Sequence, residues 1–172
     1  MITTGMVVGL LAAPSAGKTT MANNIARNMS KGGDHVVYFS MDMYETLLCA
    51  RFIQSETGYS VTKIFELIES NTKDVILEKA FEKVTNDLKN MHIDSRSGLT
   101  VEEIERTIEM YSESTGIKPR LVVIDYLEKI RGPFTDNTAN SGFVVSRLSD
   151  IAKKQDVCIL LLLQPQKSAG LS

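Results

Sequence analysis

Hydrophobic and polar residues follow two different spacings along the chain. Continuous apolar runs predict β-strands at residues 6–11, 35–39, 91–94, 121–124 and 157–163, and the run at 121–124 is typical of a central strand covered on both faces. Apolar residues at helical spacing predict helices at residues 20–29, 43–57, 61–69, 73–90, 100–115 and 143–154. Because strands alternate with helices, we predict a three-layer α/β fold with a mostly parallel central sheet.

Local signals mark the ends of some of these elements. Residues 131–142 are polar and contain Gly132 and Pro133, so we predict a loop there before the last helix. Thr100 and Glu103 have the spacing of a capping box, in which each side chain satisfies the other residue's backbone donor. In parallel sheets ligands bind at the carboxyl ends of the strands, so polar residues at those ends are candidates for function.

The first predicted strand leads directly into the loop at residues 12–19, which precedes a helix. This order is that of a phosphate-binding loop, whose backbone N–H groups and helix N-terminus attract a polyphosphate. Gly17 lets the backbone approach the anion, Lys18 adds a positive charge, and Thr19 is the expected magnesium ligand. Ala12 stands where the strict pattern has glycine, so the loop must begin with ordinary backbone angles. The nucleotide-binding residues that we predict are Ala13, Pro14, Ser15, Ala16, Gly17, Lys18, Thr19 and Thr20.

Three polar residues, Asp42, Asp125 and Gln164, stand at or just after the carboxyl ends of predicted strands. We expect the sheet to gather them around the phosphate-binding loop. Asp125 would hold Mg²⁺ together with Thr19, Asp42 would orient or deprotonate the attacking water, and Gln164 would sense the terminal phosphate. The predicted catalytic residues are Lys18, Asp42 and Gln164. The alternatives are that Asp42 is only a helix N-cap and that Gln164 bonds to its own loop.

Bulk properties narrow the class of protein. The 172 residues, 43% of them hydrophobic, suit one domain. The net charge of -2 gives no basic excess, so contact with nucleic acid would need a local patch or several chains. Cys49 and Cys158 have no partner at metal-ligand spacing, which predicts reduced thiols. The sequence shows no export signal, and residues 159–163 are too few to span a bilayer, so we predict a cytoplasmic protein.

These motifs, in this order, resemble the motor domain of the DnaB family of hexameric replicative helicases, a branch of the RecA-like ATPases. The matching segments are residues 12–20, 37–43, 93–100, 122–127 and 163–164, which together extend over nearly the whole chain. The resemblance implies a single RecA-like P-loop NTPase domain over residues 1–172, with ATP and Mg²⁺ as its ligands. It also implies ATP hydrolysis coupled to translocation along single-stranded DNA during DNA replication.

The resemblance further implies self-association into a ring whose central channel holds the DNA. The DNA-holding loops would be residues 129–142 and 165–170, in or near which Lys129, Arg131 and Lys167 are the cations available for phosphate contacts. The alternative for these three is ordinary solvated charge. Other replication proteins are implied as partners.

Three departures separate the chain from the family pattern. Asp42 stands at the position of the family's catalytic glutamate, and its carboxylate lies one methylene, about 1.5 Å, nearer its backbone. Glu128 stands where the family usually has glutamine, which places a negative charge beside the metal-binding strand end. The resemblance implies further strands and an arginine finger after the position of Ser172 and an N-terminal domain that contacts primase, and we expect the 172 residues to lack all of these. We therefore predict slow or absent ATP hydrolysis by this chain alone.

Other functions remain open from the sequence. One is a catalytically weak nucleotide-binding regulator that docks on a replicative helicase. Another is a RecA-like recombinase, which residues 93–100 disfavour because they resemble helicases more closely. A small-molecule kinase is disfavoured because the sequence contains no Arg-rich lid.

Overall fold

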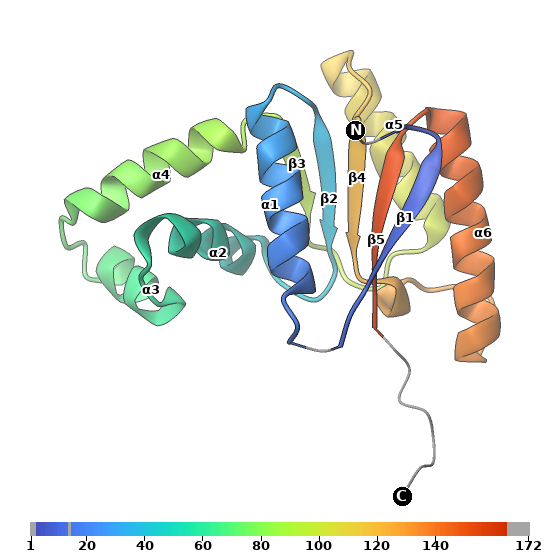
Figure 1. The fold of residues 1–172 in the computed structure, drawn as a ribbon, viewed down its shortest axis with the longest axis horizontal. Helices are drawn as coiled ribbons and strands as arrows, with labels where there is room; N and C mark the ends of the chain where they lie inside the picture. Colours follow the sequence, from blue (N-terminus) through green and yellow to red (C-terminus); the bar gives the residue numbers. More distant parts are fainter. Residues whose placement is uncertain (1–2, 14, 165–172) are drawn as a thin grey trace, which may run out of the picture.

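The computed structural model describes residues 3–13 and 15–164 (Figure 1). Its strands are β1 (Met6–Leu11), β2 (Val36–Ser40), β3 (Met91–Asp94), β4 (Leu121–Asp125) and β5 (Cys158–Leu163). They pair in parallel in the order β1-β5-β4-β2-β3. The helices are α1 (Lys18–Lys31), α2 (Glu45–Thr57), α3 (Val61–Glu69), α4 (Val75–Asp87), α5 (Val101–Thr115) and α6 (Asn137–Gln155), with a short 3-10 helix, η1 (Leu127–Lys129). The α/β fold with a parallel central sheet, predicted from the sequence, is confirmed.

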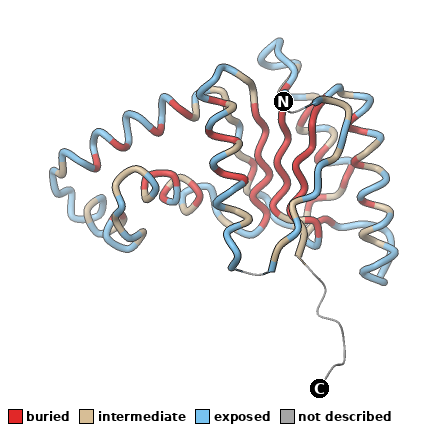
Figure 2. The backbone as a smooth tube through the Cα atoms, in the orientation of Figure 1, coloured by how far each residue is buried: buried red, intermediate tan, exposed pale blue. Residues whose placement is uncertain are grey.

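Helices cover both faces of the sheet, which is the buried centre of the molecule in Figure 2. Val37 and Phe39 of β2 point into a core shared with α5 and α6. Val36 and Tyr38 of the same strand point into a second core, shared with α1, α2, α3 and α4. Successive side chains of a strand face opposite sides, so a strand buried on both faces must be apolar throughout. This is why the central strands are continuous apolar runs in the sequence.

The helical segment between β2 and β3 is fixed to α1 by a buried ionic cluster. Arg27 of α1 is only 8% exposed. Its guanidinium donates to Asp87 of α4 at 2.7 and 3.0 Å and to Ser55 of α2 at 3.3 Å, and it lies 2.7 Å from Glu56. Lys83 of α4 pairs with Glu56 at 2.5 Å. Since every charge in the cluster has a partner, α2 and α4 are held at defined positions beside α1.

The last helix begins earlier than the sequence pattern indicates. The pattern predicts a loop over residues 131–142 and a helix over residues 143–154, but α6 starts at Asn137. Asp136 caps it by accepting a hydrogen bond from the Ala139 backbone N–H at 2.7 Å. This cap lets a polar stretch with Gly142 in its second turn become helical, so the prediction of a loop over residues 137–142 is wrong. Smaller differences concern α1, which begins at Lys18 rather than residue 20, and β2, which is shifted by one residue.

Candidate functional site

The loop between β1 and α1 leads into a helix N-terminus that no side chain caps. Its positive φ angles fall at Ser15 (62°) and Gly17 (86°) and not at Ala12, as the sequence requires. Helix α1 has no side-chain cap and no acidic residue in its first turn. The Lys18 ammonium donates to the carbonyl oxygens of Ala12 and, at 3.1 Å, of Ala13. An uncapped helix N-terminus beside a lysine is a favourable environment for an anion.

The uncapped N-terminus of α1 differs from those of several other helices, which are capped by a side chain. The capping residues of α3, α4, α5 and α6 are Ser60, Asp74, Thr100 and Asp136. In α5 the predicted capping box is present, since Thr100 and Glu103 each accept from the other's backbone N–H. Helix α1 has no side-chain acceptor of this kind at its N-terminus, and a phosphate would supply one.

Asp125, at the end of β4, lies next to the phosphate-binding loop. The Thr19 hydroxyl donates to Asp125 Oδ2 at 2.8 Å, and Asp125 is only 8% exposed. Burial and the negative charge of Asp42 raise the pKa of Asp125, against the opposing effects of the Thr19 hydrogen bond and the Lys18 charge. The Tyr38 hydroxyl is buried close to Asp125. Its burial, and in second place the charge of Asp125, raise the pKa of Tyr38 well above its usual value. A bound cation would therefore relieve an unfavourable environment at Asp125.

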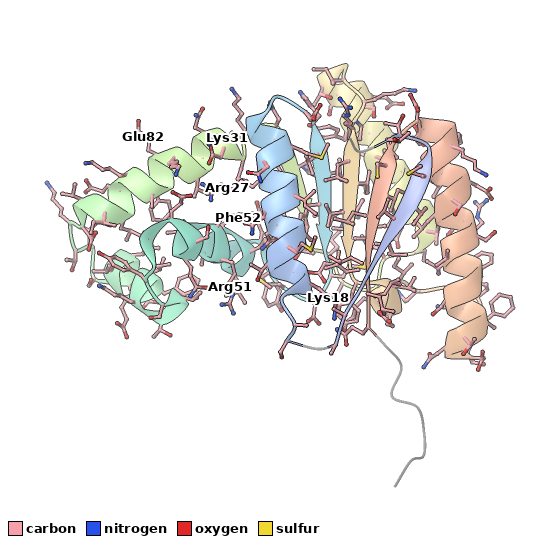
Figure 3. All side chains as sticks on the ribbon, viewed as in Figure 1. Lys18, Arg27, Lys31, Arg51, Phe52 and Glu82 are labelled. Carbon is pink, nitrogen blue, oxygen red and sulfur yellow. The ribbon has the colours of Figure 1, made fainter. Side chains whose placement is uncertain are left out.

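One cavity of about 580 Å³ lies at the carboxyl ends of the strands. Asp42, Asp125 and Gln164 contribute to it together with Ser15 and the segment 17–20. The sheet thus brings together the three strand-end residues singled out from the sequence. In Figure 3, Lys18 lies at the loop end of α1, and Arg51 and Phe52 lie on α2 beside that helix.

A second wall of the cavity was not predicted from the sequence. It is made of residues on the facing sides of α1 and α2: Asn23, Asn24, Arg51, Phe52, Gln54 and Ser55. Asn23 is 7% exposed, and Ser55 is tied to Arg27 of the ionic cluster. These residues form no recognisable motif. The helical spacing of apolar residues indicates which face of α2 packs against the rest of the protein. It does not predict that α2 packs against α1, because that packing depends on contacts between residues far apart in the sequence.

Asp42 and Gln164 lie at the rim of the cavity. The side chain of Asp42 is 56% exposed, and Lys129 Nζ lies 3.0 Å from its Oδ1. The backbone N–H of Gln164 donates to Glu128 Oε1 at 3.2 Å. Glu128, one of the departures from the family pattern, is therefore turned toward the end of β5.

The residues predicted to contact DNA are not gathered at one place. Lys129 faces Asp42 at the cavity rim. Arg131 donates from its backbone to the Leu99 carbonyl at 2.9 Å and from its side chain to the Gly98 carbonyl, so it lies against the loop between β3 and α5. Lys167, the loop at residues 165–170 and Pro14 of the phosphate-binding loop lie outside the described residues.

The remaining residues of the phosphate-binding loop have the following places. Thr20 lines the cavity, and Ala16 donates from its backbone N–H to the Ala13 carbonyl at 3.2 Å. In residues 3–13 and 15–164, no group of three or more His, Cys, Asp or Glu side chains is suited to hold a metal. Cys49 and Cys158 are free thiols. Within the same residues, none of the helices combines the length and hydrophobicity that a membrane span requires.

Comparison with known proteins gives consistent results at three levels. The sequence model of one protein family, the DnaB-like helicase C-terminal domain, matches residues 2–170 of this chain. The replicative DNA helicase DnaB of Pasteurella multocida is 31% identical over 163 residues, and the match covers 89% of this chain and 33% of that protein. The corresponding helicase of Haemophilus influenzae is 32% identical over 162 residues, with the same coverage of 89% and 33%. The chain thus spans about a third of the length of these relatives.

Solved structures share the fold. One of them, an ATPase domain, superposes with a TM-score of 0.80 at 24% identity, covering 92% of this chain and 56% of that one. A DnaB-like replicative helicase, described with its interactions with primase, gives a TM-score of 0.82 at 21% identity and covers 99% of this chain and 43% of that one. The fold is therefore that of RecA-like ATPase domains, as the sequence motifs indicated. Given the family match over residues 2–170, the chain belongs to the DnaB-like helicase C-terminal domain family.

Proposed function

We propose that this chain is the ATP-binding motor domain of a DnaB-like replicative helicase, which couples ATP hydrolysis to translocation along single-stranded DNA during DNA replication. One observation carries the proposal: Lys18 and Thr19 lie in an uncapped helix N-terminus, and the Thr19 hydroxyl is 2.8 Å from the buried carboxylate of Asp125. This combination supports binding of a polyphosphate together with its cation.

The donor set fits Mg²⁺, because hydroxyl and carboxylate oxygens are the ligands that this ion prefers. Thr19 and Asp125 would hold it, and the ion would neutralise the charge that develops on the phosphate oxygens during hydrolysis. Lys18 would exchange its contacts with the loop carbonyls for contacts with the terminal phosphates. The N–H groups at the start of α1 would bind the remaining phosphate oxygens.

In the hydrolysis step, water attacks the γ-phosphorus and the bond from that phosphorus to the β,γ-bridging oxygen breaks. ADP leaves with the bonding electrons, and the proton of the attacking water is released to solvent with the phosphate product. Asp42 would orient this water by accepting its hydrogen bond. Gln164, at the end of β5, would contact the terminal phosphate and so report whether it is present.

Single-stranded DNA, further copies of the chain in a ring and other replication proteins are the proposed partners. For DNA, Arg131 beside the loop between β3 and α5 offers a cation for phosphate contact. Lys129 and Lys167 complete the set of cations that the family resemblance implies for DNA contact.

The proposal is tested by measuring ATP turnover at rising protein concentration, with and without single-stranded DNA and Mg²⁺, for the wild type and Lys18→Ala. We expect Mg²⁺-dependent hydrolysis that is slow at low protein concentration, increases with assembly and DNA, and is absent in Lys18→Ala. Turnover that is unaffected by DNA at every concentration would contradict the motor function.

A second candidate is a nucleotide-binding regulator of a replicative helicase. The specific observation in its favour is the aspartate at position 42, where the family has glutamate, engaged by Lys129. This candidate predicts MgATP binding without turnover and stoichiometric co-sedimentation with a complete helicase. Absence of co-sedimentation would exclude it.

A further inference from the structure

Asp42 and Lys129 form an ion pair that the sheet itself brings together. Lys129 Nζ lies 3.0 Å from Asp42 Oδ1. Asp42 follows β2 and Lys129 ends η1, just after β4, and these two strands are neighbours, with Ser40 beside Asp125 in the register. The backbone N–H of Met41 donates to the Asp125 carbonyl at 3.0 Å, which continues the contact beyond the strands. The pair is therefore anchored close to the ends of two central strands.

Lys129 is held by two groups of the cavity rim. Its ammonium lies 3.0 Å from Asp42 Oδ1 and 5.6 Å from the centre of the Tyr126 ring, a distance typical of a cation–π contact. The hydrogen bond and charge of Asp42, with a smaller effect of Tyr126, raise the pKa of Lys129. Both partners, Asp42 and Tyr126, line the cavity. A positive charge therefore lies beside the carboxylate that would bind the attacking water.

An ionised carboxylate has two oxygens and about four acceptor sites, so a contact with one lysine does not use all of them. Lys129 Nζ contacts Oδ1, and the carboxylate has acceptor sites beyond this one with which it could accept a hydrogen bond from a water molecule in the cavity. An unpaired aspartate with an exposed side chain would populate several rotamers, and few of them would hold water in line with a phosphate. Fixing one oxygen selects among these rotamers.

We propose that Lys129 is a positioning residue, which holds Asp42 in the orientation that binds the attacking water. The inference rests on the proposed function, in which Asp42 orients this water. It assigns to Lys129 a role at the ATP cavity, where the sequence had suggested a DNA contact.

The test compares Lys129→Met, which keeps the aliphatic stem and removes the charge, with Lys129→Arg, which keeps the charge. Lys154→Met is the matched control, because Lys154 is also exposed and paired, with Glu105 at 2.7 Å, but lies on α6. We expect Lys129→Met to lower kcat for ATP hydrolysis about tenfold or more, with the Kd and KM for MgATP changed by less than about twofold. Lys129→Arg should recover most of the loss. In an Asp42→Ala background, Lys129→Met should have no further effect.

A second measurement does not depend on turnover. Calorimetry compares the affinity for MgADP with that for MgADP plus aluminium fluoride, which mimics the transferring phosphoryl group. We expect the wild type and Lys154→Met to gain affinity from fluoroaluminate and Lys129→Met to lose about tenfold of that gain. An equal gain in Lys129→Met, no gain in the wild type, or a kcat raised by Lys129→Met would each overturn the inference. Absence of MgADP binding by the wild type would instead overturn the proposed function.

Discussion

The inner wall of the cavity and its rim hold their carboxylates in opposite ways. Asp125 on the inner wall is 8% exposed and receives the Thr19 hydroxyl at 2.8 Å. Asp42 at the rim has a side chain that is 56% exposed and pairs with the half-exposed Lys129. Buried polar groups are fixed by their partners, whereas an exposed ion pair contributes only about 0–1 kcal/mol to stability. The fold therefore fixes the proposed metal-binding end through buried contacts, whereas the orientation of Asp42 at the rim depends on its exposed pair with Lys129.

The largest effect is expected at Arg27, which supports the second wall of the cavity, formed by α1 and α2. The variant Arg27→Met removes the buried guanidinium that pairs with Asp87 and Glu56. Breaking such a cluster should lower the free energy of unfolding by about 3 kcal/mol or more. Urea denaturation measures this change. Lys31→Met, an exposed position on the same helix that is labelled with Arg27 in Figure 3, is the control. A loss in Arg27→Met no larger than in the control would contradict the account of how α2 is held.

The next effect concerns the contact between Thr19 and Asp125. Thr19→Val keeps the shape of the side chain and removes the hydroxyl, which is both the donor to Asp125 and the proposed Mg²⁺ ligand. The variant removes one of the two proposed protein ligands of Mg²⁺, so the affinity for MgATP should fall about tenfold or more. Isothermal titration calorimetry, with Thr62→Val on the exposed side of α3 as the control, measures the change. Equal affinity in Thr19→Val and the wild type would show that the hydroxyl has no part in binding.

A smaller effect follows from the raised pKa of Asp125. Burial, with the charge of Asp42, raises this pKa above that of an ordinary aspartate, about 3.9, so the folded protein disfavours the ionised form. The stability contributed by this group is present below pH 3.9 and is lost as the pH rises through the folded-state pKa. Asp125→Asn avoids the loss, so without nucleotide or Mg²⁺ it should be more stable than the wild type at pH 7.5. The difference should narrow as the pH approaches 4.

Urea denaturation over this pH range measures the trend, and Asp150→Asn on the exposed side of α6 is the matched control. A wild type more stable than Asp125→Asn at pH 7.5 would mean that the fold favours the charge. In that case the inner wall would not need a cation.

The smallest effect is expected at the rim. Because the pair between Asp42 and Lys129 is exposed, Lys129→Met should change the free energy of unfolding by less than about 1 kcal/mol. Thermal denaturation of this variant beside Lys154→Met measures it. A loss of several kcal/mol would show that the pair is structural, and it would remove the contrast between the rim and the inner wall.

Much of the fold could be predicted from local pattern. The bounds of β1, α3 and β3 agree with the sequence pattern, because each is a short amphipathic or apolar segment between clear turn signals. The start of α6 could not be predicted from composition, since Asn, Gly and Ser between residues 137 and 142 are typical of loops. A single capping side chain, Asp136, reverses that preference.

The site could be predicted in part. The strand ends and the phosphate-binding loop meet because a parallel sheet collects its carboxyl ends at one edge, so Asp42, Asp125 and Gln164 were placed together by topology. The wall formed by α2 and the pairing of Lys129 with Asp42 depend on packing between segments distant in the sequence. Neither has a spacing that a single sequence can reveal.

The central claim is that the cavity binds a polyphosphate and its cation. The most direct test is a titration with ATP, with and without Mg²⁺, of the wild type, Lys18→Ala and Lys31→Ala. We predict saturable binding with one ATP per chain in the wild type and Lys31→Ala, strengthened by Mg²⁺ and weakened about thirtyfold or more in Lys18→Ala. No binding by the wild type, or equal binding by Lys18→Ala and Lys31→Ala, would contradict the claim.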